Sequence, residues 1–423
     1  MSRVPRLAIA FDLGTTTIAA ALSDPLTGER LATTGVLNPQ RKFGLDVVSR
    51  LDSALHAEGA LLEMKRAVNQ TLQQMALELL ANAGVPATDL RLLALAGNPA
   101  MEHILLGIPV KSLAFPPYRP LFTSGRTINS VDLGWETRAE TYIFPLPGGF
   151  VGGDLVAFLF GQEMEAARNT QQGARLYLDL GTNGEIALVQ GEKIFATSAA
   201  AGPAFEGGNL SCGMAALPGA ICGLHLEEDR VRIDTIGHGS PQGICGSGVM
   251  AAISELLQAG IIDPTGRLRP QSEISSNLAN QVTEVGGETV FVLHRDARGA
   301  IGLGQNDIRQ VQLAKAAIRA GIQVLFERSG IAADDVLEVI ITGSFGATLE
   351  PGSLKNVGIL PEKMVDISGF VREGALAGVE KAICSTGGIG AVEALAKGIR
   401  VIPLSGTPLF EKHFLEHMNF PLL

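Results

Sequence analysis

A short pattern of strands and turns occurs twice in this chain, and it restricts the folds that the chain can adopt. Residues 6 to 36 read as a strand that ends near Asp12, a Gly-Thr turn, a second strand, a tight turn and a third strand. Residues 174 to 198 repeat this order, with Asp179 at the end of the first strand. Because both copies place an aspartate, a glycine and hydroxyl residues at a strand end, the sequence predicts a duplicated α/β architecture.

The residues of the two turns are typical of phosphate binding. Backbone N–H groups and hydroxyls at such a turn can contact phosphate oxygens, and the aspartate can bind the magnesium ion that accompanies a nucleotide. The turn residues expected to bind the nucleotide are Gly14, Thr15, Thr16, Thr17, Gly181, Thr182 and Asn183. One such turn alone would also fit a purely structural role, but two copies favour ATP and Mg2+ as ligands. Asp12 and Asp179 are therefore predicted to be catalytic residues that bind the metal.

A third turn rich in glycine follows a later buried strand, in the segment VLEVIITGSFG. Small residues at a strand end let the backbone approach a planar ligand closely. By itself this segment is an ordinary glycine turn, but its position after the second hairpin favours a contact with adenosine. The residues predicted to make this contact are Gly343, Ser344, Phe345 and Gly346.

Length, composition and charge narrow the class of protein. The 423 residues exceed what one hydrophobic core usually supports, and with 46% hydrophobic and 18% charged residues the whole chain is expected to fold. The net charge of -10 and the scattered basic residues argue against nucleic acid as a partner. The apolar run at the N-terminus is too short for a signal peptide, and no run of about 18 apolar residues could span a membrane. We therefore expect no membrane association and a cytoplasmic location.

The order of these motifs resembles the superfamily of acetate and sugar kinases, heat-shock chaperone ATPases and actin. This resemblance implies a two-lobed, actin-like ATPase fold, a duplicated ribonuclease H-like architecture with a central nucleotide cleft. The two Asp-Gly-Thr hairpins correspond to the phosphate 1 and phosphate 2 motifs, and the later glycine turn to the adenosine motif. Residues 1–168 would form the N-terminal lobe and residues 174–423 the C-terminal lobe, with the last helices returning to the N-terminal lobe.

The same resemblance implies a role for Asp154. The segment GGDLVAFLFGQ has the position of the first connecting helix of the superfamily, and Asp154 has that of the acidic residue that orients the attacking group. This implies a catalytic general base or a residue that positions water. Aspartate is also a favoured N-cap, so a capping role for Asp154 stays open beside the catalytic one. Glu206, in GPAFEGG after the second hairpin, either lines the cleft or belongs to a loop.

Longer motifs resemble one family within this superfamily, the reductive activators of corrinoid proteins. Their C-terminal ATPase region is similar over nearly the whole chain, in segments such as AGNPAMEHILLG, LDLGTNGEIAL, ICGSGVMAAISELL and TGSFGATLEPGSLKNVGILP. The resemblance implies an ATPase whose partner is a corrinoid protein of a methyltransferase system. Such an activator restores the cobalt of its partner from inactive Co(II) to Co(I).

The chain departs from the pattern of this family at its start. Members usually carry an N-terminal [2Fe-2S] domain, but this chain has four cysteines, the first of them Cys212, and their spacing fits no metal site. We therefore expect no iron–sulfur cluster in this chain and four buried, reduced thiols. The chain is then a fragment, an ATPase served by a separate ferredoxin-like electron donor, or a protein without the redox role. The sequence leaves open whether it forms a homodimer.

Two other functions use the same fold and stay open. A small-molecule kinase would use Asp154 to deprotonate a substrate hydroxyl, and its turnover would require a small alcohol or carboxylate. A nucleotide-dependent binding protein would hydrolyse little ATP, although the intact phosphate turns argue against this. Because the fold alone does not separate these functions, stimulation of ATP hydrolysis by a protein would be needed to favour the activator.

Overall fold

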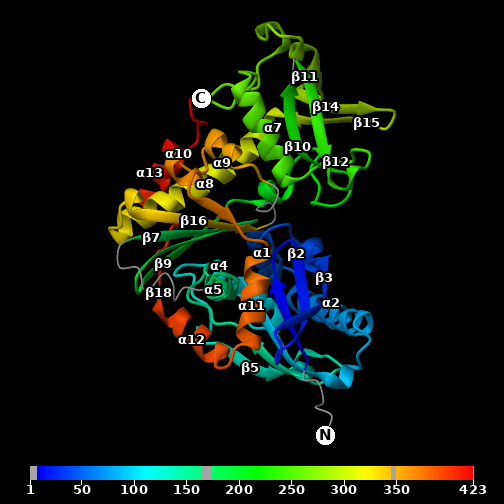
Figure 1. The fold of residues 1–423 in the computed structure, drawn as a ribbon, viewed down its shortest axis with the longest axis vertical. Coiled ribbons are helices and arrows are strands. Elements are labelled where there is room, and N and C mark those ends of the chain that lie inside the picture. The colour runs from blue at the N-terminus through cyan, green and yellow to red at the C-terminus, as the bar shows by residue number, and fades with distance from the viewer. Residues whose placement is uncertain (1–6, 163–172, 228, 344–348, 423) are drawn as a thin grey trace. The chain divides into compact units, whose positions relative to one another are not determined.

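The computed structural model describes residues 7–162, 173–227, 229–343 and 349–422, and Figure 1 shows the fold. The chain divides into two compact units that interleave along the sequence. The first consists of Met1–Gln172, Val189–Thr197 and Glu373–Val401, and the second of Gly173–Leu188, Ser198–Arg372 and Ile402–Leu423. The two lobes predicted as residues 1–168 and 174–423 stay a prediction.

The first six-stranded sheet contains the first copy of the strand–turn–strand pattern. Its strand order is β3-β2-β1-β4-β6-β5. The strands are β1 (Leu7–Leu13), β2 (Thr17–Asp24), β3 (Glu29–Leu37), β4 (Leu90–Gly97), β5 (Arg126–Asn129) and β6 (Glu140–Ile143). β1 pairs antiparallel with β2 and parallel with β4, so that Asp12 lies opposite Ala19 on one side and Ala96 on the other. Because β1 and β4 are parallel, their carboxyl ends meet at one edge of the sheet, where Asp12 lies.

The helices of the first unit complete its hydrophobic core. They are α1 (Val47–His56), α2 (Ala60–Asn82), α3 (Pro99–Leu106), α4 (Lys111–Ala114), α5 (Gly153–Gly161), α11 (Gly374–Cys384) and α12 (Gly388–Gly398). In α2 the apolar residues recur at three- and four-residue spacing, so that one face is buried in the core. α3 begins with Asn98 as its N-cap and Pro99 in its first turn, and it ends at Gly107, whose φ of 70° is left-handed.

α11 comes late in the sequence but packs against α5 in the first unit. A Cβ atom on Gly161 would lie 3.2 Å from the Cα of Gly378, and one on Gly378 would lie 1.7 Å from the carbonyl oxygen of Ala157. The two helix backbones therefore approach closely, and at Gly378 only glycine fits without a shift of the backbone. Figure 1 shows the orange α11 beside the blue strands β1 and β2, which it also contacts.

The second six-stranded sheet contains the second copy of the pattern. Its strand order is β17-β16-β7-β8-β9-β18. The strands are β7 (Ala174–Leu180), β8 (Gly184–Gln190), β9 (Lys193–Ala199), β16 (Val336–Gly343), β17 (Ser368–Phe370) and β18 (Ile399–Val401). β7 and β16 are parallel and place Asp179 opposite Thr342. Asp179 therefore lies at the carboxyl end of a parallel strand pair, as Asp12 does in the first sheet.

Two three-stranded sheets and five described α-helices also belong to the second unit. The first small sheet consists of β10 (Ala220–Glu227), β11 (Arg230–Thr235) and β12 (Gly243–Ile244), and the second of β13 (Val282–Val285), β14 (Glu288–Asp296) and β15 (Gly299–Gly304). The helices are α7 (Gly246–Gln258), α8 (Gln305–Ser329), α9 (Pro351–Val357), α10 (Glu362–Val365) and α13 (Pro408–Glu416). Sheets and helices pack together in both units, so the predicted α/β class is confirmed.

The cysteines and the helix lengths test two further predictions. All four cysteines are free, but Cys245 is the one that is fully buried; the prediction is wrong for Cys212, Cys222 and Cys384, which are partly exposed. Cys212 lies in a loop, Cys222 on the middle strand of the first small sheet and Cys384 at the end of α11, and each side chain is only partly covered. Within the residues that the structure describes, no helix is both long and apolar enough to cross a membrane.

Candidate functional site

The first glycine–threonine turn, between β1 and β2, is held by hydrogen bonds to its carbonyl oxygens. Asn38 donates twice, from Nδ2 to the oxygen of Gly14 at 2.8 Å and from its backbone N–H to the oxygen of Thr16 at 2.9 Å. Arg50 donates from Nη2 to the oxygen of Thr15 at 2.6 Å. These bonds satisfy three carbonyl oxygens of the turn that was predicted to bind phosphate.

Arg50 brings a positive charge beneath this turn. Its side chain is completely buried, and Nε also donates to the carbonyl oxygen of Gly44 at 3.0 Å. A guanidinium that is removed from water interacts strongly with charges nearby. The first turn is therefore an environment that favours an anion.

Two further residues explain the shape of the first turn. A Cβ atom on Gly14 would lie 2.5 Å from the carbonyl oxygen of Thr17, so no other residue fits there without a shift of the backbone. Asn98, the N-cap of α3, donates from Nδ2 to the hydroxyl of Thr15 at 3.0 Å and accepts from the N–H of Met101 at 3.1 Å. Asn98 thus connects the carboxyl end of β4 to the turn.

Asp154 lies at the same edge of this sheet. A Cβ atom on Gly152, which precedes α5, would lie 2.4 Å from the carbonyl oxygen of Gly97 at the end of β4. Gly152 is the N-cap residue of α5, so the capping role considered for Asp154 is wrong; Asp154 instead lies in the first turn, where Oδ1 accepts from the N–H of Leu155 at 2.8 Å. Burial raises the pKa of Asp154 to about 6. A carboxylate with this pKa is ionised at neutral pH and is also a usable proton acceptor.

Glu102 on α3 is a second acid beside Asp154, and sequence reasoning missed it. It has no exposed surface, and its Oε1 accepts from the N–H of Gly97 at 3.1 Å. Burial and the neighbouring charge of Asp154 raise the pKa of Glu102 well above its usual range. The available signal was a glutamate in an otherwise apolar segment, PAMEHILL, but such a residue is usually solvent-exposed.

The second turn, after β7, has its own set of contacts. The N–H of Gly181 donates to the carbonyl oxygen of Asn183 at 3.0 Å. The hydroxyl of Thr182 donates to Oε2 of Glu206, so the loop that follows β9 contacts this turn. Glu185, the next acid on β8, is buried and accepts from the hydroxyl of Ser198 at 3.2 Å. Two carboxylates therefore accompany Asp179 in the second unit.

The third predicted turn is only partly within the described residues. Gly343 ends β16 with a left-handed φ of 112°, and a Cβ atom there would lie 2.2 Å from the carbonyl oxygen of Leu180. This close approach of β16 to β7 requires glycine. Ser344, Phe345 and Gly346 lie outside the described residues, so their predicted contact with adenosine stays a prediction.

The predicted binding of magnesium by Asp12 and Asp179 stays a prediction, and the chemistry of each aspartate can be compared with it. The described part of the chain contains no group of three or more His, Cys, Asp or Glu side chains that could hold a metal ion. Mg2+ does not need such a cage, because it is usually bound by one or two carboxylates together with waters and phosphate oxygens of a nucleotide. Asp12 and Asp179 are each a carboxylate beside a phosphate-type turn, and each by itself has the chemistry for this mode of binding.

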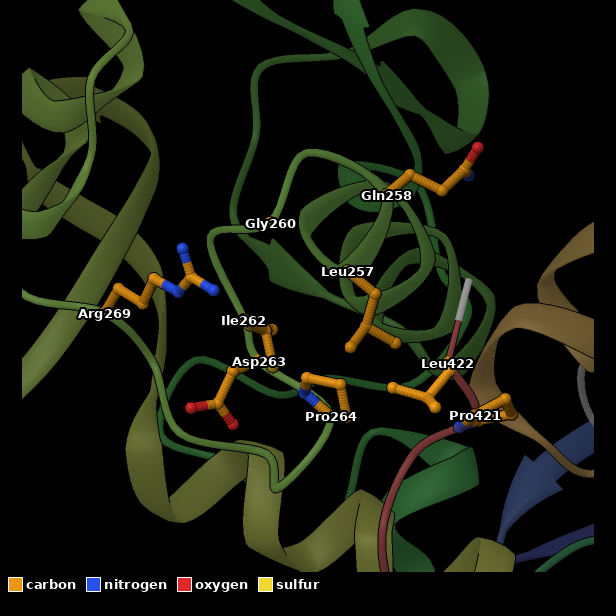
Figure 2. A pocket seen from close by; sticks show the side chains of 9 residues that line it. All are labelled: Leu257, Gln258, Gly260, Ile262, Asp263, Pro264, Arg269, Pro421 and Leu422. Atoms are coloured by element: carbon orange, nitrogen blue, oxygen red, sulfur yellow. The ribbon is translucent and has the colours of Figure 1, made fainter.

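A pocket of about 360 Å³ lies elsewhere in the second unit. Figure 2 shows that Pro421 and Leu422 of the C-terminal segment face Leu257 and Pro264 across it. The main-chain N–H of Phe420 donates to the oxygen of Pro264 at 2.8 Å and holds the segment there. Because none of the predicted site residues lines this pocket, we do not assign the nucleotide to it.

Two family models match consecutive parts of the chain. Residues 7–167 match the RACo middle region, and residues 173–422 match the C-terminal domain of RACo, the ASKHA domain. The chain belongs to the RACo family. The predicted resemblance to reductive activators of corrinoid proteins is therefore confirmed, as is the predicted actin-like ATPase class.

Named relatives of this RACo-family chain include a protein from Eubacterium limosum, the corrinoid activation enzyme RamQ. It is 31% identical over 424 residues, which cover 98% of this chain and 70% of RamQ. The [Co(II) methylated amine-specific corrinoid protein] reductase of Methanosarcina barkeri is 29% identical over 233 residues, covering 50% of this chain and 38% of the reductase. The solved structure of a reductive activator for a corrinoid, iron-sulfur protein matches with a TM-score of 0.90 and 28% identity, covering 100% of this chain and 67% of that one.

Proposed function

We propose that this RACo-family chain hydrolyses ATP in order to activate a corrinoid protein, whose cobalt returns from Co(II) to Co(I). The observation that carries the proposal is the pair of glycine–threonine turns, each beside an aspartate at the carboxyl end of a parallel strand pair. The names of the relatives support the corrinoid partner. A cytoplasmic location is part of this proposal.

The residues have distinct proposed roles in hydrolysis. The turns at Gly14–Thr17 and Gly181–Asn183 would bind the phosphates, and Asp12 and Asp179 would hold Mg2+, which would neutralise charge on the phosphate oxygens. Asp154 would accept a proton from the attacking water as its oxygen bonds to the γ-phosphorus and ADP leaves. The pKa of about 6 suits Asp154 to this task.

Hydrolysis would be coupled to cobalt reduction through the partner's affinity. Reduction of Co(II) to Co(I) takes one electron, which a separate ferredoxin-like protein would supply. A nucleotide can shift the state of the partner only if the ATP-bound and ADP-bound forms bind it with different affinity. We therefore propose that ATP binding and hydrolysis alternate between two affinities for the corrinoid protein.

The first test is ATP hydrolysis by the full chain, with and without a Co(II) corrinoid protein. We expect stimulation by the corrinoid protein, and we expect Asp12→Asn to abolish both basal and stimulated hydrolysis. Asp52→Asn is the matched control, because Asp52 is an exposed acid on α1 whose side chain is 70% accessible. Equal hydrolysis with and without the partner would contradict the activator.

The same experiment separates the alternative functions. Transfer of the γ-phosphate to a small alcohol or carboxylate would identify a kinase in which Asp154 deprotonates the substrate. Tight nucleotide binding with no turnover under any condition would identify a binding protein. Each outcome has a different product, so phosphate release and phosphoryl transfer are measured in parallel.

A further inference from the structure

Arg50 is a completely buried guanidinium that contacts the first glycine–threonine turn. It lies on α1, and Nη2 donates to the carbonyl oxygen of Thr15 at 2.6 Å. Nε donates to the oxygen of Gly44 at 3.0 Å, and Nη1 lies 3.5 Å from Oε1 of Gln40. These three partners are neutral. Because arginine stays charged in proteins, burying it costs free energy that an apolar side chain would not require. This cost favours a role for Arg50 beyond packing.

The start of α1 holds Arg50 beside the turn. Asp46 is the N-cap of α1, and its Oδ1 accepts from the N–H of Ser49 at 2.7 Å. A Cβ atom on Gly44 would lie 2.3 Å from Oγ of Ser49 and 2.9 Å from the backbone nitrogen of Arg50, so the preceding backbone packs closely on the start of the helix. Arg50 is therefore held by α1 on one side and by the oxygen of Gly44 on the other, while Nη2 reaches Thr15.

The hydrogen bond from Arg50 sets the direction of one peptide group in the turn. In a planar trans peptide, the carbonyl oxygen of one residue and the N–H of the next point in opposite directions. Within the described residues Pro116–Pro117 is the peptide bond that is cis, so the bond between Thr15 and Thr16 is trans. Because the oxygen of Thr15 faces Arg50, the N–H of Thr16 points away from the buried guanidinium.

Asn38 orients the preceding peptide group of the turn in the same way. Its Nδ2 donates to the carbonyl oxygen of Gly14 at 2.8 Å, so the N–H of Thr15 points away from Asn38. Asn38 is buried, whereas Thr17 at the end of the turn is exposed to solvent, so a ligand can reach the turn there. Successive N–H groups that are held in a turn can form a binding site for an anion.

We propose that Arg50 is a positioning residue for the phosphates of ATP: its guanidinium holds the Thr15–Thr16 peptide so that the N–H of Thr16 faces a bound phosphate. This inference rests on the proposed binding of ATP at the first glycine–threonine turn. Arg50 acts through the backbone of the turn and not by contact with the nucleotide. Its positive charge adds an attraction for the phosphate.

Equilibrium binding to the full chain tests this role, directly for ATP and by competition for adenosine. Arg50→Met loses the charge and every donor, and we expect its Kd for ATP to rise about 10- to 100-fold, a size typical of a hydrogen bond to a charged group. Its Kd for adenosine should stay unchanged, because adenosine has no phosphate. Arg50→Lys keeps the charge but not the planar set of donors, so its Kd for ATP should lie between the other two. An unchanged Kd for ATP in Arg50→Met, or an equal loss for adenosine, would overturn the proposal.

A control variant separates positioning from a loss of stability. Leu72 is a completely buried residue of α2 in the core of the same unit. Leu72→Ala leaves a cavity and should lower the melting temperature, yet leave the Kd for ATP unchanged. A loss of ATP affinity in Leu72→Ala equal to that in Arg50→Met would refute the positioning role. If circular dichroism shows that Arg50→Met does not fold, Arg50→Lys decides, and an unchanged Kd for ATP in that variant would refute the role.

The outcomes separate this inference from the proposed function. If the wild type binds and hydrolyses ATP but Arg50→Met binds it as tightly, the positioning role alone fails. If the wild type binds ATP without hydrolysing it, the proposed hydrolysis fails, while the Kd values still decide the role of Arg50. If the wild type binds no ATP, both fail.

Discussion

The buried carboxylate of Asp154 weakens the fold when it is ionised. Its carboxyl lies against the first turn of α5 and beside Glu102, and burial raises its pKa from 3.8 to about 6. An acid whose pKa is higher in the folded state binds its proton more tightly there than in the unfolded chain. The free energy of unfolding therefore decreases as the pH rises from about 4 to about 6, and the loss persists at neutral pH.

We predict that Asp154→Asn is more stable than the wild type at neutral pH but inactive. The amide removes the ionised group, and the pKa difference corresponds to at most about 3 kcal/mol of unfolding free energy. The gain should be near zero at pH 4 and reach its full size above pH 6. Denaturant unfolding at both pH values measures it, with Asp52→Asn as the exposed control. A gain that is the same at both pH values would contradict this account.

At the scale of elements, the first turn depends on α3 as much as on its own hairpin. Asn98 is both the N-cap of α3 and a donor to the hydroxyl of Thr15. Asn98 therefore connects three segments, which are the start of α3, the end of β4 and the turn between β1 and β2. Its two hydrogen bonds can be separated by substitution, because aspartate can cap a helix but cannot donate.

We predict that Asn98→Asp and Asn98→Ala separate capping from support of the turn. Asn98→Ala should lower the free energy of unfolding by about 1 kcal/mol or more, because it loses the cap. Asn98→Asp should retain most of the stability yet bind ATP more weakly, since it loses the donor and adds a negative charge beside a phosphate-type turn. Thermal unfolding and nucleotide titration measure the two effects. Unchanged ATP affinity in Asn98→Asp would argue that this turn does not bind phosphate.

At the scale of the whole molecule, each unit includes residues from late in the sequence. The first unit includes Glu373–Val401, and the second includes Ile402–Leu423. In the first unit, Arg30 on β3 forms ion pairs with Glu373, which precedes α11, and with Glu380 on α11. Oε1 of Glu380 also accepts from the hydroxyl of Ser23 at 2.8 Å. These contacts join a late helix to strands β2 and β3 of the first sheet, and the close approach of Gly161 and Gly378 joins it to α5.

We predict that Arg30→Met loosens α11 without affecting the second unit. Hydrogen exchange of the backbone amides in Gly374–Cys384 should become faster, whereas that in α8 should stay the same. Arg232→Met is the matched control, because Arg232 pairs with Glu227 at an exposed site of the second unit. An unchanged exchange rate in α11 would show that glycine packing alone holds this helix.

The sequence by itself determined the features that depend on neighbours along the chain. The repeated Asp-Gly-Thr hairpins, the α/β class and the family followed from strand alternation, turn residues and long motifs. Asp12 and Asp179 lie at strand ends as expected, because buried strands and glycine turns are specified locally.

Only the tertiary structure decided which distant side chains surround these turns. Three interactions join residues from different elements: the hydrogen bond from Arg50 to Thr15, the hydrogen bond from Asn98 to Thr15, and the electrostatic effect of Asp154 on Glu102. No periodicity or turn signal marks such contacts, because they depend on how helices pack on the sheet. The altered proton affinities of Asp154 and Glu102 arise from the same packing, since burial and neighbouring charge exist only in the folded chain.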